Sequence, residues 1–298
     1  MALIQAKPFR LALLQLGPLG RVKSANIDLA RKAVEQASKS EPKPHLIVLP
    51  EIWNSPYAVS DFREYSEPVP EPGSSSSSSS SLDEGETIRA LREMARGAGC
   101  WLIGGSIPER EISTDKIYNC ATVYDPEGRL VAKHRKVHLF DIDIPGRQTF
   151  KESETLSPGD SLTTFEAPFG KIGLGICYDI RFPEMAMIAA RQGCIAMIYP
   201  SAFNTTTGPM HWKLLQQARA MDNQIYVAMC SPARNKEASY QAYGHTMVVN
   251  PLAEVMAEAD EHPTIIYADI DPEMLATTRR NLPVTIQRRF QVYPNVAE

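Results

Sequence analysis

Three side chains of this sequence could carry out covalent chemistry together: a thiol, a carboxylate and an amine. Cys177 ends an apolar segment, 170–177, and precedes a turn and a helix that a proline opens. A cysteine at such a strand-to-helix turn is presented near backbone N–H groups. Glu51 follows the apolar segment 46–49, and Lys136 lies in a basic stretch, 133–138. These three residue types suit nucleophilic catalysis. A thiol has an ordinary pKa of about 8.5 and therefore needs a base or a cation beside it to act as a nucleophile.

Each of these residues has a simpler interpretation when it is taken alone. Cysteine is among the most buried residue types and is usually inert, so Cys177 could be a core residue. Glu51 could be a solvated turn residue, and Lys136 one more surface lysine. A histidine could also serve as the base for the thiol, but none of the six histidines carries a family-type signature.

A metal site is not expected. His134 and His138 are four residues apart and could hold zinc on a helix. No acidic general base lies between them, however, and three cations crowd the same stretch. We therefore expect neither a metal nor another cofactor.

The elements that must position these residues are short apolar runs alternating with amphipathic segments, which predicts an α/β fold with helices on the outer faces of its sheets. Proline opens two of the predicted helices. The predicted strands are 11–16, 46–49, 101–103, 120–124, 171–177, 196–199, 225–228, 247–249 and 264–269. The predicted helices are 26–38, 86–97, 183–192 and 210–222.

Composition excludes several functional classes. The chain has 298 residues, 43% of them hydrophobic, and a formal net charge of −4, which gives no electrostatic footprint for nucleic acid or an anionic membrane surface. No apolar run approaches the roughly 20 residues of a membrane-spanning helix. Five widely spaced cysteines do not form a disulfide framework. We expect a cytoplasmic protein; no transit segment is recognised, although a mitochondrial pool remains compatible.

One stretch, at about 67–86, departs from the alternating pattern. It is rich in proline, then contains the eight serines 74–81, then acidic residues. This composition is typical of a flexible surface insertion, with a regulatory phosphorylation tract as the alternative. The residues before it do not form a self-sufficient core, so we expect a single domain over 1–298.

The segments around Glu51, Lys136 and Cys177 closely resemble the Glu–Lys–Cys blocks of the nitrilase (carbon-nitrogen hydrolase) superfamily, in the same order and spacing. The resemblance covers residues 8 to 298 and implies a four-layer αββα sandwich. Segments 116–120, 138–145, 150–159, 199–209, 231–234 and 243–245 resemble the ω-amidase branch. True nitrilases usually have Cys-Trp-Glu where this chain has Cys177-Tyr178-Asp179, which disfavours nitrile hydrolysis.

The resemblance implies amide hydrolysis through a thioester on Cys177. Glu51 would act as the base, and Lys136 and the backbone N–H of Tyr178 would stabilise the oxyanion. A second acid is expected after the lysine, and the motif selects Glu152 to orient Lys136 or the substrate amide. Glu154 would share its face on a strand, so periodicity alone does not separate the two.

The implied substrates are small terminal amides of dicarboxylates, such as α-ketoglutaramate, α-ketosuccinamate and succinamate. Arg181 could clamp their distal carboxylate, or instead form a structural salt bridge with Asp179 or Glu184. The remaining pocket candidates are Tyr57, Phe203, Asn204 and Thr205.

The alternatives are a deaminated-glutathione amidase, a carbamoyl hydrolase, or a catalytically silent binding protein with the same fold. The resemblance also implies a homodimer. Met185, Met187 and Ile188 on the predicted helix 183–192, together with the aromatic and arginine residues of the tail 287–294, are candidate interface residues, with intrachain packing as the alternative.

Overall fold

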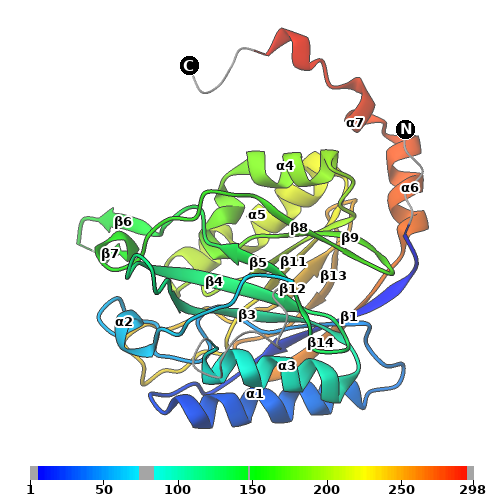
Figure 1. Cartoon of the computed structure of the whole chain (residues 1–298). Coiled ribbons are helices and arrows are strands. Elements are labelled where there is room, and N and C mark those ends of the chain that lie inside the picture. Colours follow the sequence, from blue (N-terminus) through cyan, green and yellow to red (C-terminus); the bar gives the residue numbers. More distant parts are fainter. Residues whose placement is uncertain (1–5, 74–83, 147, 294–298) are drawn as a thin grey trace.

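Two six-stranded sheets lie face to face, with helices on both outer sides (Figure 1). The computed structural model describes residues 6–73, 84–146 and 148–293. The first sheet has the order β14 (Thr264–Ile270), β1 (Phe9–Gln15), β2 (Leu46–Val48), β3 (Trp101–Arg110), β4 (Ile117–Tyr124), β5 (Leu130–Arg135). The second has the order β13 (Val255–Glu258), β12 (Met247–Val249), β11 (Tyr226–Cys230), β10 (Ala196–Pro200), β9 (Gly170–Leu174), β8 (Thr163–Ala167).

Helices cover each sheet from outside. The first sheet carries α1 (Lys23–Ser38) and α3 (Glu86–Ala98), and the second carries α4 (Pro183–Arg191) and α5 (Thr207–Asn223) (Figure 1). A ribbon of β6 (Asp141–Ile144) and β7 (Gln148–Lys151) lies at one side. Shorter helices are α2 (Phe62–Tyr65), α6 (Pro272–Asn281) and α7 (Val284–Gln287). The predicted four-layer αββα sandwich is confirmed.

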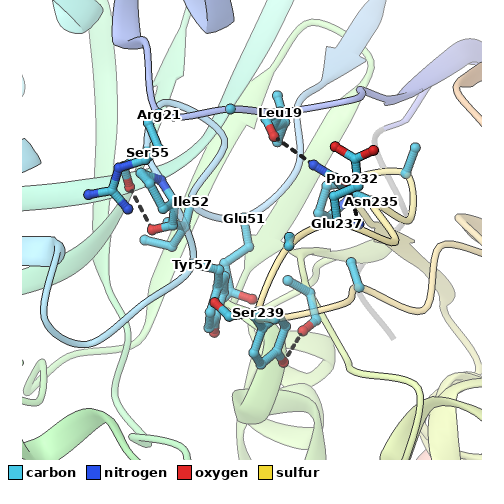
Figure 2. Close-up of a pocket in the computed structure, with 17 residues that line it drawn as sticks. Leu19, Arg21, Glu51, Ile52, Ser55, Tyr57, Pro232, Asn235, Glu237 and Ser239 are labelled. Atoms are coloured by element: carbon cyan, nitrogen blue, oxygen red, sulfur yellow. Dashed lines mark hydrogen bonds between the residues drawn. The ribbon is translucent and has the colours of Figure 1, made fainter.

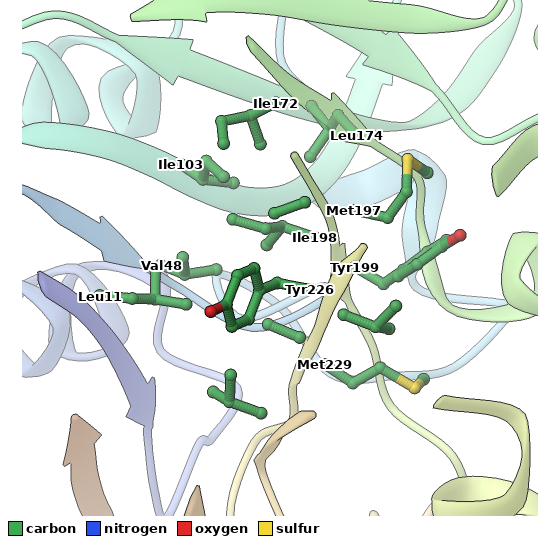
Figure 3. Close-up of a cluster of buried hydrophobic side chains, with 14 of the residues drawn as sticks. Leu11, Val48, Ile103, Ile172, Leu174, Met197, Ile198, Tyr199, Tyr226 and Met229 are labelled. Atoms are coloured by element: carbon green, nitrogen blue, oxygen red, sulfur yellow. The ribbon is translucent and has the colours of Figure 1, made fainter. Parts of the chain in front are cut away.

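Apolar side chains fill the space between the sheets. Leu11, Val48 and Ile103 of the first sheet belong to one buried cluster with Ile172 and Ile198 of the second (Figure 3). Because successive strand side chains point to opposite faces, the alternate residues of β1 and β2 pack instead against α1 and α3. Both faces of these central strands are therefore buried, which explains why they read as continuous apolar runs.

Parallel pairing brings the chemical segments to one edge. β1, β2 and β3 run parallel in the first sheet, and β9, β10 and β11 run parallel in the second. Their carboxyl ends therefore lie together, where α/β proteins form sites. Glu51 follows β2, Cys177 follows β9, and Phe203 follows β10.

Some predicted details differ from the structure. Strand β9 ends at Leu174 rather than at Cys177, because Cys177 has a φ of 46°, which a strand does not accept. Met185 is buried inside the chain and cannot serve an interface, whereas Ile188 is exposed. All five cysteines are free and buried.

The serine-rich stretch begins from packed residues. Glu67 and Val69 are buried, and the backbone of Glu67 forms an isolated parallel β-bridge with Glu109 of β3. The expected flexible insertion therefore does not include its first residues, while its centre, 74–83, lies outside the described residues. Among the parts of the chain that the structure describes, no helix is both long and apolar enough to cross a membrane.

Candidate active site

Lys136 lies between two carboxylates in the interior. Its Nζ donates to Oε1 of Glu51 at 3.1 Å and to both carboxylate oxygens of Glu152 at 2.9 Å. The side chains of all three residues have no exposed surface. The triple contact fixes the ammonium group in position and leaves two acids to compensate one cation.

Backbone geometry explains how each residue reaches this point. Glu51 lies in the turn after β2, and Lys136 follows directly after β5. Glu152 begins a short 3₁₀ turn after β7, and its Oε2 accepts the backbone N–H of Phe140 at 2.8 Å. Glu154, two residues later, is exposed, because the turn replaces the strand in which both acids would share a face.

Two further polar side chains hold the carboxylates. Tyr57 Oη lies 2.9 Å from Oε1 of Glu152 and 3.2 Å from Oε1 of Glu51, and Asn119 Nδ2 donates to the same Glu51 oxygen at 2.8 Å. The second oxygen of Glu51 is buried and has no hydrogen-bond partner among the described residues. Contact with the Cys177 side chain lowers the pKa of Glu51, so this carboxylate lies within reach of the thiol.

Cys177 begins the 3₁₀ turn Cys177–Arg181 with a left-handed backbone conformation. Such a conformation is uncommon for a residue other than glycine and occurs often at functional sites. Gly175 lets the backbone before the elbow pass close to the ring of Tyr199, because a Cβ at this position would lie only 2.6 Å from that ring. This is the sharp elbow expected after the strand.

Burial and charge set the protonation of the site. Burial raises the pKa of Glu51; Lys136 opposes this shift and Glu152 adds to it. Burial and the Glu51 charge raise the pKa of the Cys177 thiol well above its usual value, against the effect of Lys136. Burial lowers the pKa of Lys136, but Glu152 and Glu51 outweigh this, so the net shift is upward and the amine stays charged. The resting thiol is thus protonated beside a base and a cation.

A narrow cavity of about 10 Å³ opens on Cys177. Its lining residues are Phe140, Cys177, Tyr178, Arg181, Phe203, Thr207 and Tyr240. The space holds at most about one water molecule, which is too small for an amide substrate in this conformation. Tyr57, although hydrogen-bonded to both acids, is not part of this lining.

Arg181 lies at this cavity as a half-buried cation. Its guanidinium carbon is 4.9 Å from the ring centre of Phe203, and Nη1 is 3.1 Å from Nδ1 of His211. Among the described residues it forms no salt bridge with Asp179, whose carboxylate contacts two histidines, or with exposed Glu184. The salt bridge considered as a structural alternative is thus not formed among the described residues, and the buried Nε of Arg181 has no hydrogen-bond partner there.

Two predicted pocket residues do not line the cavity. The side-chain oxygen of Asn204 accepts the backbone N–H groups of Thr206 and Thr207 at 3.0 and 2.8 Å, which caps the start of α5. Thr205 is exposed in the same turn. Asn204 and Thr205 are not among the residues that line this cavity, whereas Thr207 is.

Sequence reasoning missed Tyr240 and Asn119. Tyr240 stacks on Tyr57 with ring centres 4.3 Å apart, and its hydroxyl donates to the carbonyl of Ala202 at 2.5 Å. No local motif marks it, because its loop reaches the site only in the folded chain. Asn119 lies within the segment 116–120, which resembles the ω-amidase branch, but the sequence alone indicates no role for this residue.

A larger cavity of about 380 Å³ lies on the other side of Tyr240, which lines both spaces. Figure 2 shows Glu51 and Tyr57 on one side of it and Pro232 and Asn235 across from them. Glu51 therefore borders this second space, although its side chain has no exposed surface.

Comparisons with known proteins agree with this geometry. A family model described as carbon-nitrogen hydrolase matches residues 10–280. Omega-amidase NIT3 of Saccharomyces cerevisiae is 50% identical to this chain, over 98% of this chain and 97% of its own length. Omega-amidase NIT2 of Homo sapiens is 49% identical, over 96% of this chain and 96% of its own length. The crystal structure of Saccharomyces cerevisiae Nit3, a member of branch 10 of the nitrilase superfamily, aligns with a TM-score of 0.87 at 47% identity, covering 97% of this chain and 99% of that one. The chain therefore belongs to the carbon-nitrogen hydrolase family, and it is an amidohydrolase of the nitrilase superfamily.

Proposed function

We propose that the protein is an ω-amidase that hydrolyses terminal amides of small dicarboxylates through a thioester on Cys177. The observation that carries the proposal is the buried Lys136, bonded to Glu51 and Glu152 beside a thiol in a left-handed elbow. The ω-amidase names of relatives at about half identity support the same class of substrate. A silent binding protein would not need this costly buried charge cluster.

The first half-reaction forms the thioester. Glu51 takes the thiol proton as the sulfur of Cys177 attacks the amide carbon, and the carbonyl oxygen becomes an oxyanion. Once Glu51 carries the thiol proton, Lys136 turns the N–H that it gave to Glu51 toward this oxyanion, and the backbone N–H of Tyr178 donates as well. When the tetrahedral intermediate collapses, the C–N bond breaks and protonated Glu51 returns its proton to the nitrogen, which leaves as ammonia.

The second half-reaction repeats these steps with water. Glu51 removes a proton from water, the oxygen attacks the thioester carbon, and the same donors hold the new oxyanion. The C–S bond then breaks, the sulfur regains its proton from Glu51, and the dicarboxylate leaves. Glu152 holds Lys136 throughout, because both of its oxygens accept from Nζ.

Arg181 supplies the group for the distal carboxylate. It lies at the same cavity as Cys177, and its free guanidinium face suits two parallel hydrogen bonds to a carboxylate. Burial lowers its pKa, but an arginine remains charged at neutral pH. Because Cys177 and Arg181 line the same small cavity, we expect a short chain between the amide and the carboxylate.

The test compares ammonia release from α-ketoglutaramate, succinamate and deaminated glutathione. A higher kcat/KM for the two small diacid monoamides, lost in Arg181→Met, supports the proposal. The larger cavity keeps deaminated glutathione as the second candidate, because it could hold a dipeptide portion once Tyr240 moves. A preference for deaminated glutathione would reject the ω-amidase assignment.

A homodimer is proposed as well. Helix α5 exposes Met210, Leu214 and Met221 by 56–62%, and Ile286 of α7 is 67% exposed. Apolar side chains of this size along one helix are typical of a surface covered by a second copy. Sedimentation should give a dimer at micromolar concentration and a monomer for Leu214→Glu; a monomeric wild-type protein would contradict the proposal.

A further inference from the structure

Asp179 lies under the elbow as a fully buried carboxylate with four N–H donors. Its Oδ1 accepts from Nδ1 and the backbone N–H of His138 at 2.8 and 2.9 Å. Its Oδ2 accepts from Nε2 of His134 at 3.2 Å and from the backbone N–H of Ile176 at 2.9 Å. All acceptor positions thus point at groups of the protein, and none is left for a substrate.

The four donors come from two separate parts of the chain. His134 and His138 lie two residues before and two residues after Lys136, and Ile176 directly precedes Cys177. The two segments belong to different sheets, since Lys136 follows β5 and Cys177 follows β9. Asp179 therefore links the lysine segment to the cysteine elbow through hydrogen bonds.

The carboxylate is ionised, which makes this connection strong. Burial raises the pKa of Asp179, but hydrogen bonds from the two histidines outweigh it and hold the pKa well below the usual range. An ionised carboxylate only accepts, so both ring nitrogens that face it carry protons. Charge-assisted hydrogen bonds of this kind are about twice as strong as neutral ones.

The other end of the elbow has its own anchor. Arg219 of α5 donates from Nε to the carbonyl of Ile180 at 2.8 Å and from Nη2 to the carbonyl of Arg181 at 3.0 Å. Loss of the Asp179 contacts would therefore release Cys177 relative to Lys136 while Arg181 stays in place. Chemistry would suffer more than the binding of the substrate carboxylate.

We infer that Asp179, through His134 and His138, is a positioning residue that sets Cys177 against Lys136 for the attack on the amide. The inference rests on the proposed function in its use of these two residues as nucleophile and oxyanion donor. It adds a role for the two histidines, which the mechanism itself does not use.

The test is a pair of substitutions at His138, a partly exposed residue whose ring also stacks on Phe182 at 3.6 Å. His138→Ala removes both the stacking and the hydrogen bond to Asp179. His138→Asn also removes the stacking, but its amide nitrogen takes the place of Nδ1 and still donates. The pair therefore separates the hydrogen bond from the loss of the ring.

We expect His138→Ala to lower kcat about tenfold and Asp179→Asn about 10²-fold, with KM changed less than about threefold, because small misplacements of reacting groups act on the chemical step. His138→Asn should recover kcat to within about threefold of the wild type, because it keeps the hydrogen bond to Asp179, whose loss would lower kcat several-fold. Equal kcat values for His138→Ala and His138→Asn, or a wild-type kcat in His138→Ala, would overturn the inference. Thermal melting identifies any variant that fails to fold.

Alkylation of Cys177 by iodoacetamide, followed by mass spectrometry, gives a readout that needs no substrate. His138→Ala should react more slowly at neutral pH than both the wild type and His138→Asn, because its thiol has lost its place beside Glu51 and Lys136. If the wild type releases no ammonia from any diacid monoamide while this order holds, the substrate assignment fails and the positioning role stands. Identical alkylation rates in all three proteins would reject the positioning role.

Discussion

Replacing Lys136 separates its geometry from its charge. Lys136→Ala removes an oxyanion donor, which typically costs 10²–10³ in kcat, or about 2.7–4 kcal/mol. It also leaves Glu51 and Glu152 facing each other in a site with no exposed surface. Removing one partner of a buried ion pair costs about 3–5 kcal/mol of unfolding free energy. With an unfolding entropy of about 2.1 cal/mol/K per residue, a chain of 298 residues should lose about 5–8 °C of melting temperature.

The stability deficit should depend on pH with a definite sign. Burial and Glu152 already raise the pKa of Glu51, and loss of the cation raises it further. A carboxyl group with a raised folded-state pKa stabilises the fold fully below its unfolded value of about 4.5, and this contribution is lost as pH rises through the folded value. Lys136→Ala should therefore lose more melting temperature at pH 8 than at pH 5, relative to the wild type.

Lys136→Arg keeps the charge without the compact ammonium geometry, and we expect no recovery of ammonia release although the fold should be better preserved than with alanine. Lys133→Ala is the matched control, because this lysine pairs with Glu109 and lines neither cavity. Near wild-type turnover of Lys136→Arg would show that the lysine acts only as a general charge, and the oxyanion role would be refuted. If Lys136→Ala loses the same melting temperature at pH 5 and at pH 8, relative to the wild type, the argument that the raised pKa of Glu51 destabilises this variant would be refuted.

Three other outcomes are expected. Tyr57→Phe removes a hydroxyl shared by Glu51 and Glu152, and one hydrogen bond is worth about 1 kcal/mol. We therefore expect kcat to drop by about 5–10-fold with little change in melting temperature. An unchanged kcat would mean that the hydroxyl is dispensable. The acid limb of kcat/KM should lie above pH 4.5, because burial raises the pKa of Glu51 and the base must be ionised; a limb at or below 4.5 would exclude Glu51 as that base. Tyr240→Ala joins the two cavities, so kcat/KM for deaminated glutathione relative to succinamate should increase, and an unchanged ratio would show that Tyr240 does not limit substrate size.

Much of the architecture could be predicted because it follows from local patterns. The strands that carry Glu51 and Cys177 are buried on both faces and therefore stand out as apolar runs, and proline marks the start of α4. Strands β5, β6, β7, β8 and β13 escaped prediction. The residues of β5 alternate between buried and partly exposed, those of β6, β8 and β13 are mostly exposed or partly exposed, and β7 is mostly polar, so these segments resemble loops in sequence.

The pocket could be predicted only in part, because long-range contacts build it. Asn204 lies after a strand end, as pocket residues do, but its side chain serves the first turn of α5. Tyr240 lies in a polar loop that nothing in the sequence connects with Cys177, yet it closes the cavity. The partners of Asp179 are similarly remote, since His138 is 41 residues away along the chain.

The most direct test of the central claim is to look for the acyl group on Cys177. The wild-type enzyme is mixed with succinamate, quenched in acid within the first turnovers, digested and analysed by mass spectrometry, with Cys177→Ala as the control. We predict a single succinyl group on the peptide that contains Cys177, removed by neutral hydroxylamine, and no label on the peptides of Cys100, Cys120, Cys194 or Cys230. Ammonia release in the first turnover without label on Cys177, or turnover that persists in Cys177→Ala, would contradict the account.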